Sequence, residues 1–311
     1  EKIGMLPRIF NIVATALNCS TMNWRNAMRL TPLLWSIIFL VLPIAAMAQD
    51  SKEVLVKELY VKSGLEKQMG QLPMLVQAGY DQAVAADDNL REMPQSDIRE
   101  IRASIETVFA PEKIQKTIMN ECREKLSIED LKKVIEWLDS PVGRKFTRLE
   151  EIASTPEKYD EMLRYAQKLQ ESPPAPERLE IMKQLDAAVK ATKTTVEIAM
   201  NTQLAVAMAV VASLPKEQQP GYDTLADTIK QTRPQLESAM RTQTIYSMLY
   251  SYRSATNEEL SQYIAFASSP AGQIYHDVTI SGAKKAMMAA SYKWGEVIAD
   301  ILNQNGGKAD V

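Results

Sequence analysis

Residues 126–150 read LSIEDLKKVIEWLDSPVGRKFTRLE, and residues 255–279 repeat the same pattern as ATNEELSQYIAFASSPAGQIYHDVT. Each copy opens with a hydroxyl residue, Ser127 or Thr256, and acidic residues follow within three positions, which is typical of a helix start. Apolar residues then recur every three or four positions, so each copy predicts an amphipathic helix of about three turns. The sequence therefore predicts an all-α protein built from two tandem helical-bundle repeats.

The pattern Ser-Pro-x-Gly ends this first helix in both copies. Proline has no backbone N–H and disfavours helical geometry in the preceding residue, so we expect the serine to cap a second helix that begins at the proline. The glycine lies inside that second helix, where it costs about 1 kcal/mol relative to alanine, and close approach of another backbone would explain its presence. The corner residues are Ser140, Pro141 and Gly143 in the first copy and Ser269, Pro270 and Gly272 in the second.

Aromatic residues flank each corner. Trp137 and Phe266 precede the serines, and Phe146 and Tyr275 lie one turn into the second helices. Large aromatic residues at helical spacing usually bury their area in a core, so we expect each corner to be held by its own aromatic pair. The capped helix start could instead bind an anion, but no basic residue is shared by both copies to support this function.

Together these features resemble the bacterial family known as domain of unknown function 2059. The resemblance rests on the acidic helix start, the apolar helix ending in an aromatic residue, Ser-Pro-x-Gly and the following aromatic residue. It is closest in EELSQYIAFASSPAGQIY of the second copy, and the first copy departs from it at residues 137–139 and 144–145. The resemblance implies an all-helical domain of exported bacterial proteins, and it brings no assigned activity, substrate or catalytic residue.

Residues 1–48 predict upstream sequence followed by a secretory signal peptide. Two arginines precede an apolar segment at residues 33–44, and Ala-Met-Ala at residues 46–48 matches a cleavage site. We therefore expect export to the periplasm of a Gram-negative-type cell. The alternative is an inner-membrane protein held by an uncleaved anchor, because residues 30–48 are long enough to span a bilayer.

The chain after residue 48 is acidic and has one cysteine. The whole sequence has 36 basic and 39 acidic side chains, and without residues 1–48 the numbers are 32 and 38, a net charge near −6. We therefore expect no nucleic-acid partner. Cys122 alone cannot form an intramolecular disulfide, so stability should come from packing. We interpret Cys122 as a small helical residue; the alternative is a reactive or dimer-forming thiol.

Helical periodicity continues almost without interruption from residue 51, and no alternating strand pattern of useful length occurs. Ser-Pro-Pro-Ala-Pro at residues 172–176 is the clearest linker signal, because stacked prolines cannot continue a helix. We expect a first repeat at residues 52–171, a second at 177–303 and a disordered tail at 304–311. The two repeats should pack through the inner faces of their corners.

One stretch of the second repeat has no equal in the first. Residues 204–214, LAVAMAVVASL, would be apolar on every face of a helix, which is typical of a central buried helix. At 11 residues the stretch is too short to span a membrane. Alternatively it forms the floor of a groove for a lipid or another apolar ligand, with adaptable walls supplied by Met200, Met208, Met240 and Met248.

No recognisable catalytic or metal-binding arrangement is present in the sequence. The single histidine, His276, has no metal-ligand partner at helical spacing, and we interpret it as an exposed polar helix residue. Ser281 and Lys284 match the short S-x-x-K pattern of serine penicillin-recognising enzymes, but the other motifs of those enzymes do not follow. An enzyme that uses His276 or Ser281 is therefore the least favoured hypothesis.

Charged clusters have simpler interpretations. The carboxylate pairs at residues 150–151 and 258–259 read as capping groups or solvated helix faces, because nothing in the sequence places them in a cleft. Arg144, Lys145 and Arg148 read as a solvated basic face.

These observations favour a non-enzymatic exported module for protein interaction or scaffolding, which would act through a protein partner or self-association. The alternative is a carrier or sensor of an apolar small molecule or lipid. We expect no cofactor, no metal and no catalytic residue, and membrane contact only through an uncleaved N-terminal segment.

Overall fold

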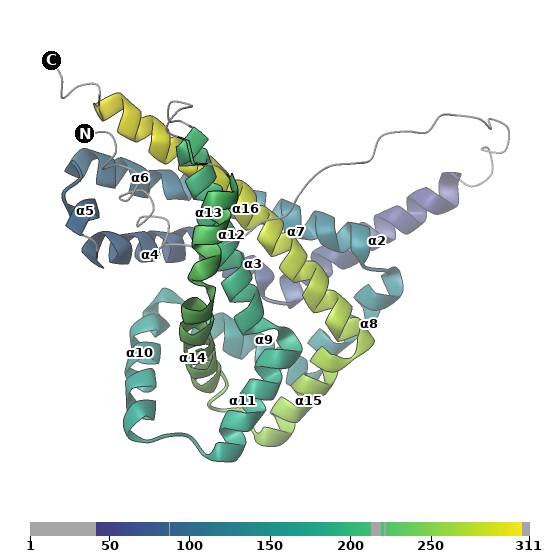
Figure 1. Cartoon of the computed structure of the whole chain (residues 1–311). Helices are drawn as coiled ribbons and strands as arrows, with labels where there is room; N and C mark the ends of the chain where they lie inside the picture. The colour runs from purple at the N-terminus through teal and green to yellow at the C-terminus, as the bar shows by residue number, and fades with distance from the viewer. Residues whose placement is uncertain (1–41, 87, 213–218, 221, 307–311) are drawn as a thin grey trace.

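The computed structural model describes residues 42–306 except 87, 213–218 and 221 (Figure 1). The regular elements of these residues are all helices, and no strand occurs among them. The predicted all-α class is therefore confirmed. Most of the apolar N-terminal segment lies outside the described residues, and α2 (Leu42–Lys62) runs through the position predicted for signal cleavage. The signal peptide stays a prediction.

Before the proline-rich segment the helices are α2, α3 (Leu65–Gly70), α4 (Leu72–Ala86), α5 (Asp88–Arg91), α6 (Gln95–Val108), α7 (Pro111–Lys125), α8 (Ile128–Asp139), α9 (Pro141–Ala153) and α10 (Pro156–Glu171). After it they are α11 (Pro176–Val189), α12 (Ala191–Ala212), α13 (Tyr222–Gln231), α14 (Arg233–Ser251), α15 (Asn257–Ser268) and α16 (Pro270–Gly306). The break between α10 and α11 falls within the predicted linker. Because α16 continues to residue 306, the first residues of the predicted tail are helical, and 307–311 lie outside the described residues.

Helices α12 and α16 cross at the centre of the molecule and run in the same direction (Figure 1). Gly295 of α16 allows close contact, since a Cβ there would lie 2.6 Å from the Val206 carbonyl oxygen and the Ala209 Cβ. From Met200 to Val211 every residue except Met208 is buried. The prediction of a central buried helix at residues 204–214 is confirmed for residues 204–211 apart from Met208, whereas Ala212 is exposed.

The helix that contains this apolar segment is longer than the 11 residues expected from the sequence. Helix α12 has 22 residues, and among the described residues it alone is long and apolar enough to cross a membrane. Most of its apolar window is buried inside the protein, and the core helix of a water-soluble protein passes the same test. Length and composition alone therefore give only weak evidence for a membrane span.

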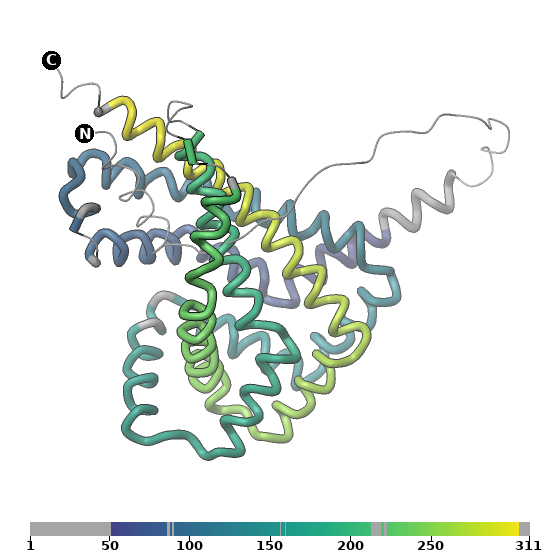
Figure 2. The backbone as a smooth tube through the Cα atoms, in the orientation of Figure 1, coloured from purple at the N-terminus to yellow at the C-terminus, as the bar shows by residue number. Residues whose placement is uncertain are grey.

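The helix after each corner also packs on the opposite half of the chain. We call the described residues up to 171 the first half and those from 176 the second half. Helix α8 packs on α2 and α15 packs on α11, each within its own half, whereas α9 packs on α14 and α16 packs on α7. Figure 2 shows α16 running from α15 back across the first half. The two halves therefore interlock.

The hydrophobic core follows from this exchange. Its largest cluster contains Leu59 and Ile118 of the first half together with Val206 and Trp294 of the second half. The Trp294 ring lies edge-on to the rings of Tyr80 and Phe109, at a centroid distance of 5.9 Å in each case. The predicted repeats therefore share their main core.

Candidate functional site

The two Ser-Pro-x-Gly corners have the same local geometry. In each, the serine hydroxyl oxygen accepts a hydrogen bond from the glycine N–H, at 2.9 Å in the first corner and 3.1 Å in the second. A Cβ on Gly143 or Gly272 would lie 2.0 Å from the carbonyl oxygen of Trp137 or Phe266. The close approach expected at these glycines is real, and it is made by the last turn of the preceding helix in the same corner.

The aromatic residues meet across the two corners. Trp137 stacks on Phe266 with ring centroids 4.7 Å apart and planes inclined by 9°. The Tyr263 ring lies 6.1 Å from that of Trp137 and 4.8 Å from that of Phe146. The predicted pairing within each corner is wrong, because no such ring contact occurs among the described residues. Phe146 and Tyr275 are buried, as expected for core residues, while Trp137 and Phe266 are half-buried.

These rings line a cavity of about 160 Å³ where the two corners meet. All four predicted corner aromatics and Gly143 contribute to its wall. Its lining also includes polar side chains from both halves, namely Gln68, Thr147, Glu150, Tyr263, Tyr275 and His276. The corners therefore bring together an aromatic wall and several hydrogen-bonding groups.

Glu150 is the acidic group of this cavity. Its Oε1 atom accepts hydrogen bonds from the hydroxyls of Tyr252, at 2.7 Å, and Tyr263, at 3.1 Å. Burial raises the pKa of Glu150, although the two tyrosine hydroxyls lower it in part. The interpretation of residues 150–151 as a solvated pair is therefore wrong for Glu150. Glu151 differs, since it accepts a hydrogen bond from the exposed Lys67 at 2.6 Å.

His276 contributes an imidazole to the same cavity. Its Nε2 atom is buried and has no hydrogen-bond partner in the described part of the chain. Burial, together with the nearby charge of Lys190, lowers the pKa of His276 to about 4, so the ring is neutral near pH 7. The expectation of an exposed helix residue is therefore wrong. A buried ring nitrogen without a hydrogen-bond partner is unusual in folded proteins.

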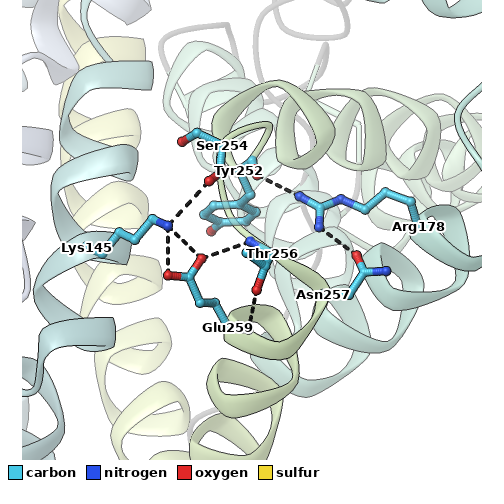
Figure 3. A network of polar contacts seen from close by, with 7 residues as sticks. All are labelled: Lys145, Arg178, Tyr252, Ser254, Thr256, Asn257 and Glu259. Carbon is cyan, nitrogen blue, oxygen red and sulfur yellow. Dashed lines mark hydrogen bonds and ion pairs between the residues drawn. The ribbon is translucent and has the colours of Figure 1, made fainter.

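The position of Tyr252 is fixed from the second half. Arg178 of α11 donates to the Tyr252 carbonyl oxygen at 2.6 Å and to Asn257 Oδ1 at 2.9 Å (Figure 3). Both acceptors flank the turn between α14 and α15. Arg178 therefore holds the segment that presents the tyrosine hydroxyl to Glu150.

A second set of polar contacts joins the two halves near this turn (Figure 3). Lys145 Nζ lies 2.7 and 2.6 Å from the two carboxylate oxygens of Glu259 and 3.3 Å from the Ser254 carbonyl oxygen. Glu259 also accepts from the Thr256 N–H at 2.8 Å, which closes the capping box of α15. Lys145 is thus an interhelix contact, whereas Arg144 and Arg148 are exposed as expected.

The remaining candidate residues have separate partners. Ser281 donates to Glu121 at 2.9 Å, and Lys284 pairs with Glu197, so neither lines the cavity between the corners. Cys122 is buried, and burial raises the pKa of its thiol to about 12, as expected for an unreactive residue. Within the described ranges no group of three or more His, Cys, Asp or Glu side chains could hold a metal ion.

Two larger grooves are present, one on the second half and one between the two halves. One of about 660 Å³ is lined by α11, α12 and α14, and one of about 840 Å³ is lined by α10 and α14. None of the four methionines proposed as adaptable walls lines either groove or the cavity between the corners.

The helical spacing places Glu150 on the buried face of α9, although its charge is typical of a solvent-exposed residue. Gly143, Phe146 and Glu150 are spaced by three and four residues and so share one helix face. Tyr252 gave no comparable signal, because it lies in the turn before the second copy begins.

No protein-family model matches this chain, and neither the curated proteins nor the solved structures contain a chain similar to it. The resemblance to domain of unknown function 2059 therefore stays a prediction.

Proposed function

We propose that this protein is a non-enzymatic module that binds a small molecule in the cavity between its two corners. One observation carries the proposal: Glu150 and His276 line the same cavity of about 160 Å³, and the Nε2 atom of His276 has no hydrogen-bond partner among the described residues. Buried polar groups in proteins are almost always hydrogen-bonded, so this pair favours a bound polar partner. A carrier or a sensor would need such a concave site.

We also propose that the protein arose by internal duplication, that it is exported, and that it belongs to the family that its corner motif resembles. The matching caps and glycine contacts of the two corners support an internal duplication with repeats at residues 52–171 and 177–303. The N-terminal sequence supports export to the periplasm. The corner motif supports membership of the family called domain of unknown function 2059.

Native mass spectrometry of the full protein, purified gently from the cells that make it, tests the binding function. We expect an additional mass that disappears on denaturation. The His276→Phe variant should lose this mass while it keeps its helical circular dichroism, because the larger ring fills the cavity. A bare wild-type mass, or a mass that His276→Phe retains, would count against binding at this site.

A second candidate function is recognition of a protein partner. The groove of about 840 Å³ between α10 and α14 has apolar walls that include Met162, Leu163, Ala239 and Tyr246, and Leu163 is exposed. Such a groove suits the apolar face of an amphipathic helix. A photo-crosslinker at position 163 should capture a protein in cells, and Ala239→Glu on the opposite wall should abolish capture. Unchanged capture would exclude the groove as the binding surface.

A further inference from the structure

The groove of about 660 Å³ on the second half is basic, although the protein as a whole is acidic. It is lined by α11, α12 and α14, which pack on one another (Figure 1). The whole sequence has 36 basic and 39 acidic side chains. The lining of the groove has two acidic side chains, Asp186 and Glu237, and five basic ones, namely Lys183, Lys190, Lys193, Arg233 and Arg241. The positive charge is therefore a local feature that the composition of the chain does not predict.

The two acidic side chains of the groove already have partners. Asp186 is buried, and its carboxylate oxygens accept hydrogen bonds from the Thr192 N–H, at 2.7 Å, and from the Thr192 hydroxyl, at 2.8 Å. Glu237 pairs with Arg241 at 2.9 Å. Neither carboxylate therefore neutralises the remaining basic side chains of the groove.

Two of those basic side chains have no acidic partner in the described part of the protein. Lys183 and Lys190 pair with acidic side chains outside the groove. Lys193 and Arg233 are exposed, and no described carboxylate forms an ion pair with either of them. Ammonium and guanidinium groups are the side-chain groups that bind carboxylates and phosphates most strongly. Lys193 and Arg233 are therefore available to the acid group of a ligand.

Helices α11 and α14 run in opposite directions along this groove. Arg178, near the start of α11, donates a hydrogen bond to the carbonyl oxygen of Tyr252, the residue that follows α14. The start of α11 therefore lies beside the end of α14. The end of α11, where α12 begins, lies toward the start of α14 (Figure 1).

This arrangement gives the groove an apolar end and a basic end. Leu179 near the start of α11 and Ile245 and Tyr246 near the end of α14 form the apolar end. Lys193 in the first turn of α12 and Arg233 in the first turn of α14 form the basic end. A ligand that contacts both ends must carry an acid group and an apolar part.

We propose that this groove binds an amphiphilic anion, whose carboxylate or phosphate group lies at the basic end and whose alkyl chain lies along the apolar end. The volume of about 660 Å³ is within the range of about 300–1,000 Å³ that is typical of small-molecule sites. The groove shares no lining residue with the cavity between the corners. Binding in the groove therefore does not depend on the function proposed for that cavity.

Isothermal titration of the full-length protein, freed of bound lipid, tests the proposal with probes of equal chain length. Octanoate and octyl phosphate are anions, 1-octanol is neutral and octyltrimethylammonium is a cation. We expect the better of the two anions to bind at least about tenfold more tightly than 1-octanol or octyltrimethylammonium, because hydrogen bonds to charged groups are the stronger ones. Tighter binding of octanoate would indicate a free fatty acid as the ligand, and tighter binding of octyl phosphate a lipid phosphate. Equal binding of 1-octanol, or no binding of either anion, would overturn the proposal.

Shorter acids test the apolar end. Each buried methylene group adds to the hydrophobic free energy of binding, so octanoate should bind roughly tenfold more tightly than hexanoate. Acetate should bind more weakly still. Equal affinities of acetate and octanoate would show that the alkyl chain makes no contact, and the ligand would not be an amphiphile.

Charge variants locate the acid group. The double variant Lys193→Gln/Arg233→Gln should reduce octanoate affinity by at least about tenfold and leave 1-octanol binding unchanged. The matched control Arg144→Gln/Arg148→Gln removes the same charge from exposed positions of α9 outside the groove, and it should have little effect. An equal loss of affinity in the two double variants would show that the overall charge attracts the anion, and it would contradict the site.

A steric variant separates this groove from the cavity between the corners. Ala187 is exposed and lines the groove, so Ala187→Trp should block octanoate binding while the helical circular dichroism stays unchanged. His276→Phe alters only the cavity between the corners and should keep octanoate binding. Loss of octanoate binding in His276→Phe but not in Ala187→Trp would place the anion in that cavity and overturn the proposal. Because each variant affects one site, failure of either site leaves the test of the other intact.

Discussion

Gly143 and Gly272 set the angle of the two corners. An alanine at either position would place its Cβ 2.0 Å from a carbonyl oxygen of the preceding helix, so the backbone must shift. We expect Gly143→Ala and Gly272→Ala each to lower the free energy of unfolding by about 1–3 kcal/mol, although alanine has the better helix propensity. Urea denaturation followed by circular dichroism measures the change.

Gly79 provides the matched control. It lies inside α4, and a Cβ there would meet nothing within 4 Å. Gly79→Ala should raise the free energy of unfolding by up to about 1 kcal/mol. If Gly143→Ala and Gly272→Ala instead raised the free energy of unfolding, as expected for Gly79→Ala, the close approach at the corners would not contribute to stability.

At the residue scale, the features that depend on local geometry are predictable from the sequence. The capping serines and the constrained glycines follow from the chemistry of a few adjacent residues. The burial of Glu150 and His276 is not predictable in this way. Helical periodicity gives the direction of a side chain, but it gives no information about how deeply a neighbouring helix covers that side chain. Their burial depends on the crossing of the two halves.

Helix α16 is joined to α7 by a buried carboxylate. Glu121 accepts hydrogen bonds from Ser281, at 2.9 Å, and from Lys285, and it pairs with Lys125 at 2.7 Å. Burial by itself raises the pKa of Glu121, but these three groups outweigh it and lower the pKa to about 2. Because the pKa is depressed in the folded state, this contribution to stability is present above about pH 4.5 and is lost as the pH falls toward 2.

We therefore expect Glu121→Gln to reduce the free energy of unfolding at pH 7 by about 1–3 kcal/mol, with a difference from wild type that shrinks as the pH falls from 4.5 toward 2. Denaturant titrations across this pH range measure it. Glu124→Gln removes an exposed carboxylate from the same helix and should have a small effect at any pH. If the difference in free energy of unfolding between Glu121→Gln and wild type did not change with pH, altered packing rather than the lost charge would explain it.

The elements themselves were predictable, and their partners were not. The corners, the break after Glu171 and the burial of the apolar stretch all follow from periodicity and proline placement. The full extent of α12 was missed, because buried polar residues such as Thr202 and Gln203 interrupt the apolar pattern. The packing of α9 on α14 was missed as well, since an amphipathic face indicates burial without naming the helix that covers it.

The shared core makes a prediction for the whole molecule. Separation of the chain within residues 172–175 should give two fragments that each expose apolar surface, because α9 and α16 pack on opposite halves. We expect each fragment alone to show little cooperative unfolding, and an equimolar mixture to regain the helical signal and melting transition of the intact protein. Circular dichroism and size-exclusion chromatography measure both properties. Cooperative melting of either isolated fragment would refute the dependence on a common core.

The position of Trp294 has a consequence for synthesis. This ring, which closes the core around Tyr80 and Phe109, follows them in the sequence by 214 and 185 residues. Contacts between residues so distant in sequence form late, and a chain that is synthesised from its N-terminus cannot make them until α16 has emerged. The apolar helix faces of the first half therefore stay exposed until α16 packs on them. We expect chaperones that bind unfolded chains to affect the yield of this protein more than the intrinsic stability of its helices does.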